Sequence, residues 1–260
     1  MQSTTLSTGR ARWPLLGALM LGAMCTEPSA AQPGKDDVLA RSIALYPTLK
    51  SYADTGTVVR ETPGGMVERW KFTTYFRQPL DFRLDFQGVN WQSGPGAPVD
   101  TSYHRMVLWM INGELQAFNQ QLRTHETIRN QVAAMQGATV GTVGTSTLIP
   151  SLIFAKANLS GTLRQIQQAT NAGFETVNGR RCHKIIGMAG EYYPSGQMTN
   201  VRQVTVWIDA ETLLVRRVFE DTPKGYPLGS YSRLTVTIEP TANAALEDSK
   251  FRFTVPTFQQ

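Results

Sequence analysis

The acids Asp209 and Glu211 have the spacing that most invites a chemical interpretation. They lie one residue apart within VTVWIDAETLLVRRV, residues 204–218. A glycosidase needs two carboxylates on opposite sides of its substrate, in environments that separate their pKa values. Here a single alanine separates the acids and apolar runs flank them, which is typical of a turn whose aspartate accepts backbone N–H groups. The sequence therefore predicts a hairpin tip and no catalytic pair.

Histidine and cysteine, the other usual carriers of chemistry, are sparse and scattered. His104 and His183 lie on predicted strands, and His125 lies in a stretch that is predicted to be helical. Cys182 precedes His183, but neighbours on a regular strand point to opposite faces and cannot share a site. No His-x-x-x-His or Cys-x-x-Cys spacing is present to hold zinc. We expect no metal, and a buried Cys182 that acts as a small apolar residue.

Glycine motifs that bind nucleotides or activate a serine are also missing. Gly137, Gly141 and Gly144 fit neither G-x-G-x-x-G nor the phosphate-binding P-loop. The run from Gly144 begins like the G-x-S-x-G nucleophile elbow, but Leu148 stands where the second glycine belongs. We expect these glycines to act as hinges. No cofactor and no catalytic residue is predicted.

Residues 1–31 have the pattern of a secretory signal peptide. Arg10 and Arg12 precede the apolar run WPLLGALMLGAM (13–24), and small residues suited to a signal peptidase follow. The apolar run is too short to span a bilayer comfortably. We expect cleavage near Ala31 and an exported, periplasmic protein.

Loss of the signal peptide would change the cysteine count and the charge. Cys25 would leave with it; Met24 stands where lipid attachment to Cys25 requires a small residue, so a lipid-anchored form is the less favoured alternative. Cys182 would then remain alone, which excludes an internal disulfide. The formal charge would fall from +5 to +4, because two arginines and one glutamate are lost. No basic cluster is present, so we expect no nucleic-acid partner.

The periodicity of apolar residues predicts an N-terminal helix followed by antiparallel strands. Residues 35–50 carry acids at the start, a lysine at the end and apolar residues at helical spacing. After residue 51 the period changes to two, as in strands with one apolar and one polar face. Asn112-Gly113 and Asn178-Gly179 are typical of tight hairpin turns. The expected strands lie within residues 51–62, 66–77, 80–86, 103–111, 114–118, 174–190, 204–218, 231–240 and 249–256, with a loop over 87–102.

A helical, glycine-rich insert at about 120–170 interrupts the strands. Residues 120–136 lack alternation and are predicted to be helical. The three hinge glycines then lead into TLIPSLIF (147–154), where Pro150 interrupts the helical pattern. A further helical turn is expected at 162–169. This order of elements predicts a single α+β domain over residues 32–260, built on a large antiparallel sheet.

The apolar face of this sheet must be covered, and two architectures would do so. In the first, helices pack directly on the sheet as a closed core. In the second, a curved sheet and a movable lid enclose an apolar cavity for an acyl chain; the hinge glycines, Pro150 and the aromatic residues of the sheet favour it. The expected cavity lining is Trp70, Phe72, Phe76, Phe82, Leu84, Phe86, Trp109, Val206 and Ile208, with Val107 beside them. The expected lid is Leu148, Ile149, Leu152, Ile153 and Phe154.

Five stretches of the sequence resemble the outer-membrane lipoprotein carrier (LolA/LolB-like) superfamily. They are SYADTGTVV, FTTYFRQPLDFRLDF, LWMINGELQAF, VTVWIDAETLLVRRV and FRFTVP, and the resemblance spans residues 38–256. The most similar branch comprises exported lipoprotein-sorting and uncharacterised periplasmic proteins. The resemblance implies an incomplete antiparallel β-barrel, a strongly curved sheet that helices cover on its concave side. It specifies no catalytic residue.

The same resemblance implies a function in binding without catalysis. In the carriers, acyl chains of lipoproteins enter an apolar cavity and are handed to a receptor. The long insert departs from the best-known carriers and leaves the cargo open, and their gating arginine does not map onto a residue of this chain. We therefore expect a monomeric periplasmic binding or carrier protein for lipid or lipoprotein acyl chains. The sequence leaves open a membrane-protein partner in the envelope, and whether the ligand is delivered or only held.

Two other functions stay open at this point. A lipid-responsive sensor or partner-binding module of the same fold would show an exposed strand edge or surface aromatic residues. An enzyme that acts on an envelope lipid would need polar groups converging in the cavity. His104 and Arg105 are the one hint of such an enzyme, and it would require His104 to face inward beside an acid.

Overall fold

The described part of the chain belongs to the second of its two compact units, Met1–Lys35 and Asp36–Gln260. The structure is a computed structural model, and it describes residues 37–62, 65–88, 104–111, 113–192, 198–222 and 232–257. The predicted signal peptide with Cys25, most of the predicted loop at 87–102 and Asn112 lie outside these residues.

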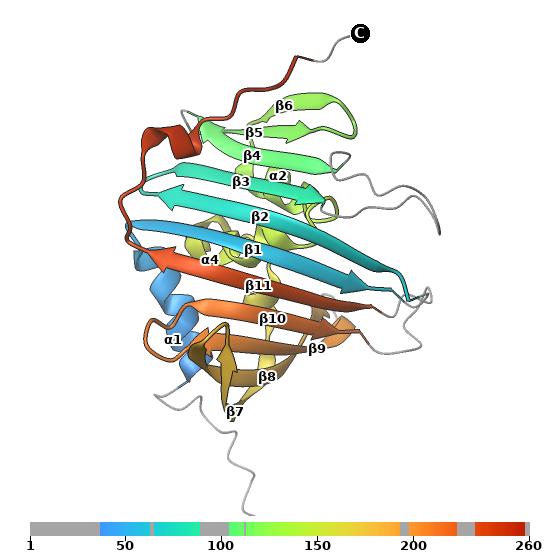
Figure 1. Ribbon diagram of the computed structural model, residues 1–260, viewed down its shortest axis with the longest axis vertical. Coiled ribbons are helices and arrows are strands. Elements are labelled where there is room, and N and C mark those ends of the chain that lie inside the picture. The colour runs from blue at the N-terminus through green and yellow to red at the C-terminus, as the bar shows by residue number, and fades with distance from the viewer. Residues whose placement is uncertain are drawn as a thin grey trace, which may run out of the picture. The chain divides into compact units, whose positions relative to one another are not determined.

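Eleven strands form one antiparallel sheet in the order β6-β5-β4-β3-β2-β1-β11-β10-β9-β8-β7 (Figure 1). Strands β6 and β7 are its two edges, so the sheet is open, and the predicted incomplete barrel with helices on one side is confirmed. The strands are β1 (Ser51–Glu61), β2 (Val67–Arg77), β3 (Asp81–Gly88), β4 (Arg105–Ile111), β5 (Glu114–Asn119), β6 (Thr124–Ile128), β7 (Gln167–Val177), β8 (Arg180–Tyr192), β9 (Met198–Asp209), β10 (Val215–Asp221) and β11 (Arg233–Ala242).

The helices are short, and those of the N-terminus and the insert lie behind the sheet in Figure 1. They are α1 (Val38–Leu45), α2 (Gln131–Gly137), α3 (Thr145–Leu148), α4 (Pro150–Ile153) and α5 (Thr162–Gln165). Turns of 3-10 helix follow at Tyr46–Thr48, Ala155–Ala157 and Asp248–Phe251. Within the described ranges, none of these helices has the length and apolar character needed to cross a membrane.

Local sequence signals set where the helices begin. Asp37 caps α1, because its carboxylate accepts N–H bonds from Leu39 at 2.9 Å and Ala40 at 3.2 Å. Pro150 occupies the first turn of α4, where the N–H that proline lacks would have no partner. Gly144 precedes α3 with a φ of 84°, a left-handed conformation that glycine adopts without strain.

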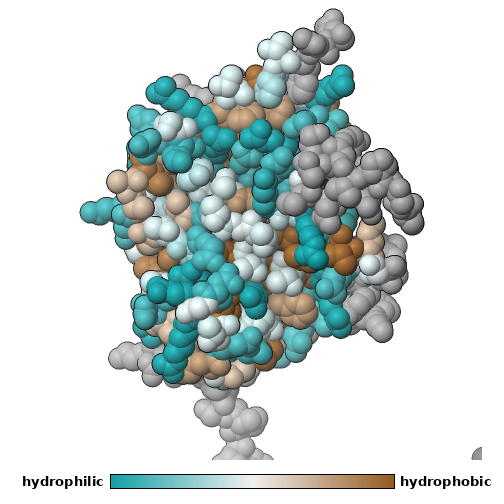
Figure 2. Space-filling model, viewed as in Figure 1, coloured by the Kyte–Doolittle hydropathy of each residue, from teal (hydrophilic) through white to brown (hydrophobic). Residues whose placement is uncertain are grey.

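One face of the sheet is apolar and packs against the helices; we call it the helix-covered face, and its reverse the open face. In β3 every second residue is buried, and Phe82, Leu84 and Phe86 pack on the helix-covered face. Phe86 lies opposite Phe72, and Phe82 lies opposite Phe76. Figure 2 shows that the open face is mostly hydrophilic. The predicted alternation of an antiparallel sheet with one wet face is confirmed.

Three segments differ from the sequence prediction. Residues 124–128, which were expected to be helical, form β6 against β5, and α2 begins only at Gln131. Strand β7 begins at Gln167, inside the predicted helical insert. Residues 249–256 form no strand but a 3-10 turn and an extended segment. In the first two cases, pairing with a neighbouring strand overrides the local preference of a short segment. In the third, the segment packs on the sheet through Phe253 and Val255 without pairing.

The prediction that Trp109 and Val107 share the helix-covered face is wrong. Leu108, which lies between them, is opposite Leu84, so Leu108 takes that face and its neighbours take the open one. Because β4 is apolar on both faces, its periodicity could not show which face turns toward the helices. A second cluster on the open face contains Val107, Trp109 and Phe118, covered by Phe253 and Val255 of the C-terminal segment.

Candidate functional site

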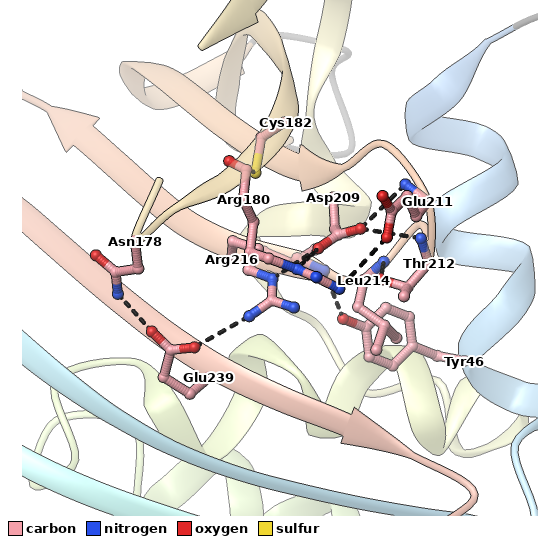
Figure 3. Close-up of polar contacts among 11 residues, drawn as sticks. Tyr46, Asn178, Arg180, Cys182, Asp209, Glu211, Thr212, Leu214, Arg216 and Glu239 are labelled. Carbon is pink, nitrogen blue, oxygen red and sulfur yellow. Dashed lines mark hydrogen bonds and ion pairs between the residues drawn. The ribbon is translucent and has the colours of Figure 1, made fainter. Parts of the chain in front are cut away.

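The tip of the β9–β10 hairpin places Asp209 and Glu211 in different surroundings (Figure 3). The buried Asp209 accepts N–H bonds from Glu211 and Thr212, both at 3.0 Å, and its Oδ2 lies 2.9 Å from Nε of Arg216. The side chain of Glu211 is 79% exposed and its Oε2 lies 3.5 Å from Arg180. The two acids do not oppose each other across a cleft, and the predicted turn is confirmed.

The electrostatics of Asp209 are those of a structural carboxylate. Burial acts to raise its pKa, but the N–H groups of Thr212 and Glu211 and the guanidinium of Arg216 outweigh burial and lower it. Arg216 also lies 3.0 Å from Glu239 on β11, so one arginine links three neighbouring strands. A carboxyl group that is held ionised in this way is unsuited to the role of general acid.

His104 and Arg105, the hint of an enzyme, point to opposite faces. The Nε2 atom of His104 lies 2.7 Å from the carbonyl oxygen of Gly141, and its ring packs edge-on against Phe86. It therefore faces the helices, but beside a main-chain carbonyl and not an acid. Arg105 lies on the open face, where its Nη2 is 2.6 Å from a carboxylate oxygen of Asp85. The two residues form no joint site.

Cys182 and His183 also diverge, as their adjacent positions predict. Cys182 is buried beside Trp207, and burial raises the pKa of its thiol, which disfavours a nucleophilic thiolate. His183 packs against Phe174 on the other face of the sheet. The third histidine, His125, lies on β6 and not on a helix.

The helix-covered face has an apolar pocket close to the β6 edge, where α2 lies against β4, β5 and β6. Its volume is about 330 Å³, at the lower end of the range of small-molecule sites. Most of the wall is apolar, and Glu126 is the one charged side chain in it. The pocket is lined by Met106, Leu108, Ala117, Phe118, Asn119, Leu122, Thr124, Glu126, Ile128, Ala133, Ala134, Gly137 and Ala138.

Helix α2 leaves this space open because the side that it presents to the pocket is made of small residues. Asn130 caps the helix by accepting the N–H of Ala133 at 3.0 Å. Ala133, Ala134, Gly137 and Ala138 then recur at helical spacing along the pocket wall. A Cβ atom at Gly137 would meet no atom within 4 Å. A larger side chain, or a methylene group of a ligand, therefore fits here without displacing protein.

The residues predicted to line a cavity form the packed core beside this pocket. Apart from Trp109, the predicted lining belongs to the main core, as do Leu148, Ile149, Leu152 and Ile153 of the predicted lid. Phe154 makes edge-on contacts with Phe76 and Phe82, with ring centroids 5.5 and 5.4 Å apart. None of these predicted residues lines the pocket at α2. Their contact with a ligand stays a prediction.

Sequence reasoning missed the residues that do line the pocket. The available signal was the run of small residues in VAAMQGA, residues 132–138, which follows a helical spacing. The signal from the opposite wall was hidden, because Met106 and Leu108 belong to a strand that is apolar on both faces. The third wall is strand β6, over residues 124–128, where the sequence predicts a helix.

A fully buried polar chain joins the N-terminal helix to the sheet. Tyr46, just after α1, accepts an N–H bond from Val215 of β10 at 2.9 Å. Its ring centroid lies 5.6 Å from that of Tyr52, which donates its O–H to Asp54 at 2.8 Å. Burial raises the pKa of Asp54 to about 7, so this carboxyl group is partly protonated at neutral pH. The chain fixes α1 to two strands through polar contacts.

Comparison with known proteins gives similarity in structure only. No protein-family model matches the chain, and no curated protein is significantly similar to it. LprF from Mycobacterium bovis is similar over 85% of this chain and 94% of that chain, at 14% identity and a TM-score of 0.42. A putative outer membrane lipoprotein-sorting protein domain from Vibrio parahaemolyticus is similar over 82% of this chain and 94% of that chain, at 10% identity and a TM-score of 0.36. A LolA superfamily protein from Nitrosomonas europaea is similar over 83% of this chain and 96% of that chain, at 6% identity and a TM-score of 0.32.

These three proteins resemble this chain in structure alone. Their identities and TM-scores are low, so what this chain binds must be argued from its own pocket and surfaces.

Proposed function

We propose that the protein binds the acyl chain of a lipid or lipoprotein and carries it within the cell envelope, after export and removal of residues 1–31. The observation that supports this most is the pocket beside α2. It is apolar, it has room for a side chain at Gly137, and it adjoins the main core on the helix-covered face. Such a role needs no catalytic residue.

The construction of the insert supports a cover that can move to enlarge the pocket. Helix α2 has seven residues, and α3 and α4 have four each. Helices of this length are not stable alone, so they depend on their contacts with the sheet. Many of those contacts are apolar and non-directional, and an acyl chain can replace them. Hydrogen bonds such as that between His104 and Gly141 hold the insert at fixed points. Phe76, Phe82 and Phe154 would then meet the ligand.

The energy of binding would come from burial of apolar surface. Each buried methylene contributes about 0.8 kcal/mol, so roughly ten methylenes would gain about 8 kcal/mol before the cost of ordering the chain. Glu126 is the one carboxylate in the wall, so the pocket has few polar groups that could recognise a particular head group. We therefore propose selection for chain length over selection for head group.

Native mass spectrometry of the protein purified from a periplasm, with identification of extracted lipids, tests this function. We expect a bound acyl-chain species in near-stoichiometric amount. Gly137→Leu should weaken the affinity for lipid by about tenfold and so lower lipid occupancy, because the new side chain occupies the pocket, at a cost in binding of about 1.4 kcal/mol. Gln136→Leu is the matched control, since Gln136 is exposed on the same helix and does not line the pocket.

The two variants separate loss of the pocket from a general effect on α2. Equal occupancy in Gly137→Leu and Gln136→Leu would remove the pocket from the proposal. A mass free of lipid, with no uptake of added phospholipid or acylated peptide, would contradict lipid binding altogether.

A further inference from the structure

Strand β7, the edge opposite the pocket, contributes almost nothing to the core. Of its eleven residues only Val177 is buried, and residues 167–172 are exposed on both faces of the sheet. Its pairing with β8 is irregular between Gln167 and Thr170 and between Asn171 and Phe174. From Phe174 to Val177 the register is regular. Among the residues that the structure describes, no strand pairs with the outer edge of this last part, so an extended chain can add to it.

An aromatic and basic patch lies next to this regular part of the edge. Phe174 is 51% exposed. The guanidinium carbon of Arg181 lies 3.6 Å from the centroid of its ring, and the His183 ring centroid lies 4.5 Å away. Phe174 pairs with His183, which lies opposite the core residue Ile208, so the patch is on the side of α1.

The patch carries two exposed arginines, Arg41 and Arg181. Within the described ranges, neither Arg181 nor Arg41 of α1 forms an ion pair. The charges of both arginines reach His183. Its pKa is lowered first by burial and then by the charges of Arg181 and Arg41. Arg41, Phe174, Arg181 and His183 together form what we call the α1–β7 patch.

We propose that the α1–β7 patch is the docking site of an extended acidic segment of a partner protein, which adds a strand along Phe174–Val177. Its carboxylates would contact Arg41 and Arg181, where the positive charge is unpaired. Its backbone would pair with the free edge of β7, and Phe174 would anchor one of its side chains. A membrane surface fits less well, because one half-exposed ring is too little apolar area for insertion among lipids.

This inference goes beyond the lipid-binding role and does not depend on it. The pocket is beside β6 and the patch is beside β7, at opposite edges of the sheet. Loss of one function therefore need not affect the other, and the two proposals can fail separately.

Binding of a capped synthetic peptide that alternates glutamate with valine, measured by fluorescence anisotropy, tests the proposal. We expect the peptide to bind at least about tenfold more tightly than the same peptide with lysine in place of glutamate. Arg181→Glu, Arg41→Glu and Phe174→Ala should each weaken binding, the charge reversals by about tenfold. Arg129→Glu, near the opposite edge, makes the same change in net charge and should leave binding unchanged.

Two further measurements identify the mode of binding. Methylation of alternate backbone nitrogens on one edge of the peptide should abolish binding, because an added strand needs those N–H groups. Gly137→Leu should bind the peptide normally. Equal binding of the acidic and basic peptides, or full binding by Arg41→Glu and Arg181→Glu, would overturn the proposal. The proposal would also be overturned if the peptide does not bind but phosphatidylglycerol vesicles do, and if that vesicle binding requires these arginines.

Discussion

At the scale of single residues, the buried aspartates Asp209 and Asp54 differ in the groups that surround them, and their pKa values shift in opposite directions. Asp209 has two backbone N–H groups and Arg216, and its pKa is lowered. Asp54 has no cation beside it, and its pKa is raised to about 7. Both lie on the sheet, where their partners tie them to its structure, so we expect each to act on stability.

Replacement of Asp209 should be costly, whereas replacement of Glu211 should not. Asp209→Ala leaves Arg216 buried with only Glu239, itself 49% exposed, as its acid, and removes the acceptor of two N–H groups. We expect a loss of about 3 kcal/mol in the free energy of unfolding. Glu211→Ala should change it by less than about 0.5 kcal/mol. Urea unfolding of both variants compares them, and similar losses would contradict the structural role of Asp209.

Asp54 should make the protein less stable as the pH rises through neutrality. Its pKa is raised from 3.8 to about 7 on folding, so the folded state holds the proton more tightly than the unfolded one. The stabilisation is full below about pH 4 and is lost as the pH rises through about 7, with a magnitude on the order of 4 kcal/mol. Asp54→Asn should remove this dependence.

The pH effect is checked by urea unfolding at pH 5 and pH 8. The difference in stability between the wild type and Asp54→Asn isolates Asp54 from other titrating groups, because those are common to both proteins. Asp81→Asn, the same change at a half-exposed aspartate that pairs with Arg77, is the control. A difference between wild type and Asp54→Asn that is constant across this range would show that Asp54 does not titrate there.

At the scale of elements, two segments cover the two faces of the sheet. On one face the insert covers the main core and leaves the pocket beside α2. On the other, the C-terminal segment after Phe251 carries Phe253 onto Trp109 and Phe118, with ring centroids 5.0 and 5.3 Å apart. Arg83 donates a hydrogen bond to the carbonyl oxygen of Arg252 at 2.6 Å and so holds this segment in place.

The C-terminal segment should be needed for stability although it forms no strand. Phe253→Ala should lower the free energy of unfolding by about 2 kcal/mol, since the ring is partly buried on an aromatic cluster and two arginines lie over it. Phe174→Ala, at a half-exposed phenylalanine, should cost less than about 1 kcal/mol. Thermal unfolding compares the stability losses of the two variants. A larger loss in Phe174→Ala than in Phe253→Ala would contradict the role of the C-terminal segment.

At the scale of the whole molecule, the open sheet separates two proposed functions. The pocket for an acyl chain is beside β6, and the patch for an acidic segment is beside β7, with nine strands between these edges. Neighbouring strands are about 4.8 Å apart. Measured across the strands of the sheet, the two sites are therefore too far apart to contact each other directly. A lipid carrier that also meets a protein partner would use both edges of an incomplete barrel.

The double variant Gly137→Leu/Arg181→Glu should combine the effects of its single changes additively. Distant sites with no shared partners are additive within about 0.5 kcal/mol. We therefore expect lipid occupancy to match that of Gly137→Leu and peptide affinity to match that of Arg181→Glu. Native mass spectrometry and anisotropy on the same samples make the comparison. A coupling larger than this would mean that ligand binding changes the conformation of the β7 edge.

Sequence patterns alone determined the class of fold, the hairpin tip at Asp209 and the apolar face of β2 and β3. Alternation with period two reports which residues of a strand share a face, and Phe82, Leu84 and Phe86 obey it strictly. The resemblance to LolA-like proteins was also present in these motifs.

Only the tertiary structure decided the face of β4, the strand at 124–128, the pocket and the α1–β7 patch. A strand that is apolar on both sides, as around Trp109, has no periodic signal for its orientation; register with Leu84 sets it. Short segments such as β6 take their conformation from the strand with which they pair. A pocket is a space between elements, and the patch combines residues of α1, β7 and β8, with the charges of Arg41 and Arg181 both acting on His183. Both depend on distances between residues far apart in the chain, which local sequence does not encode.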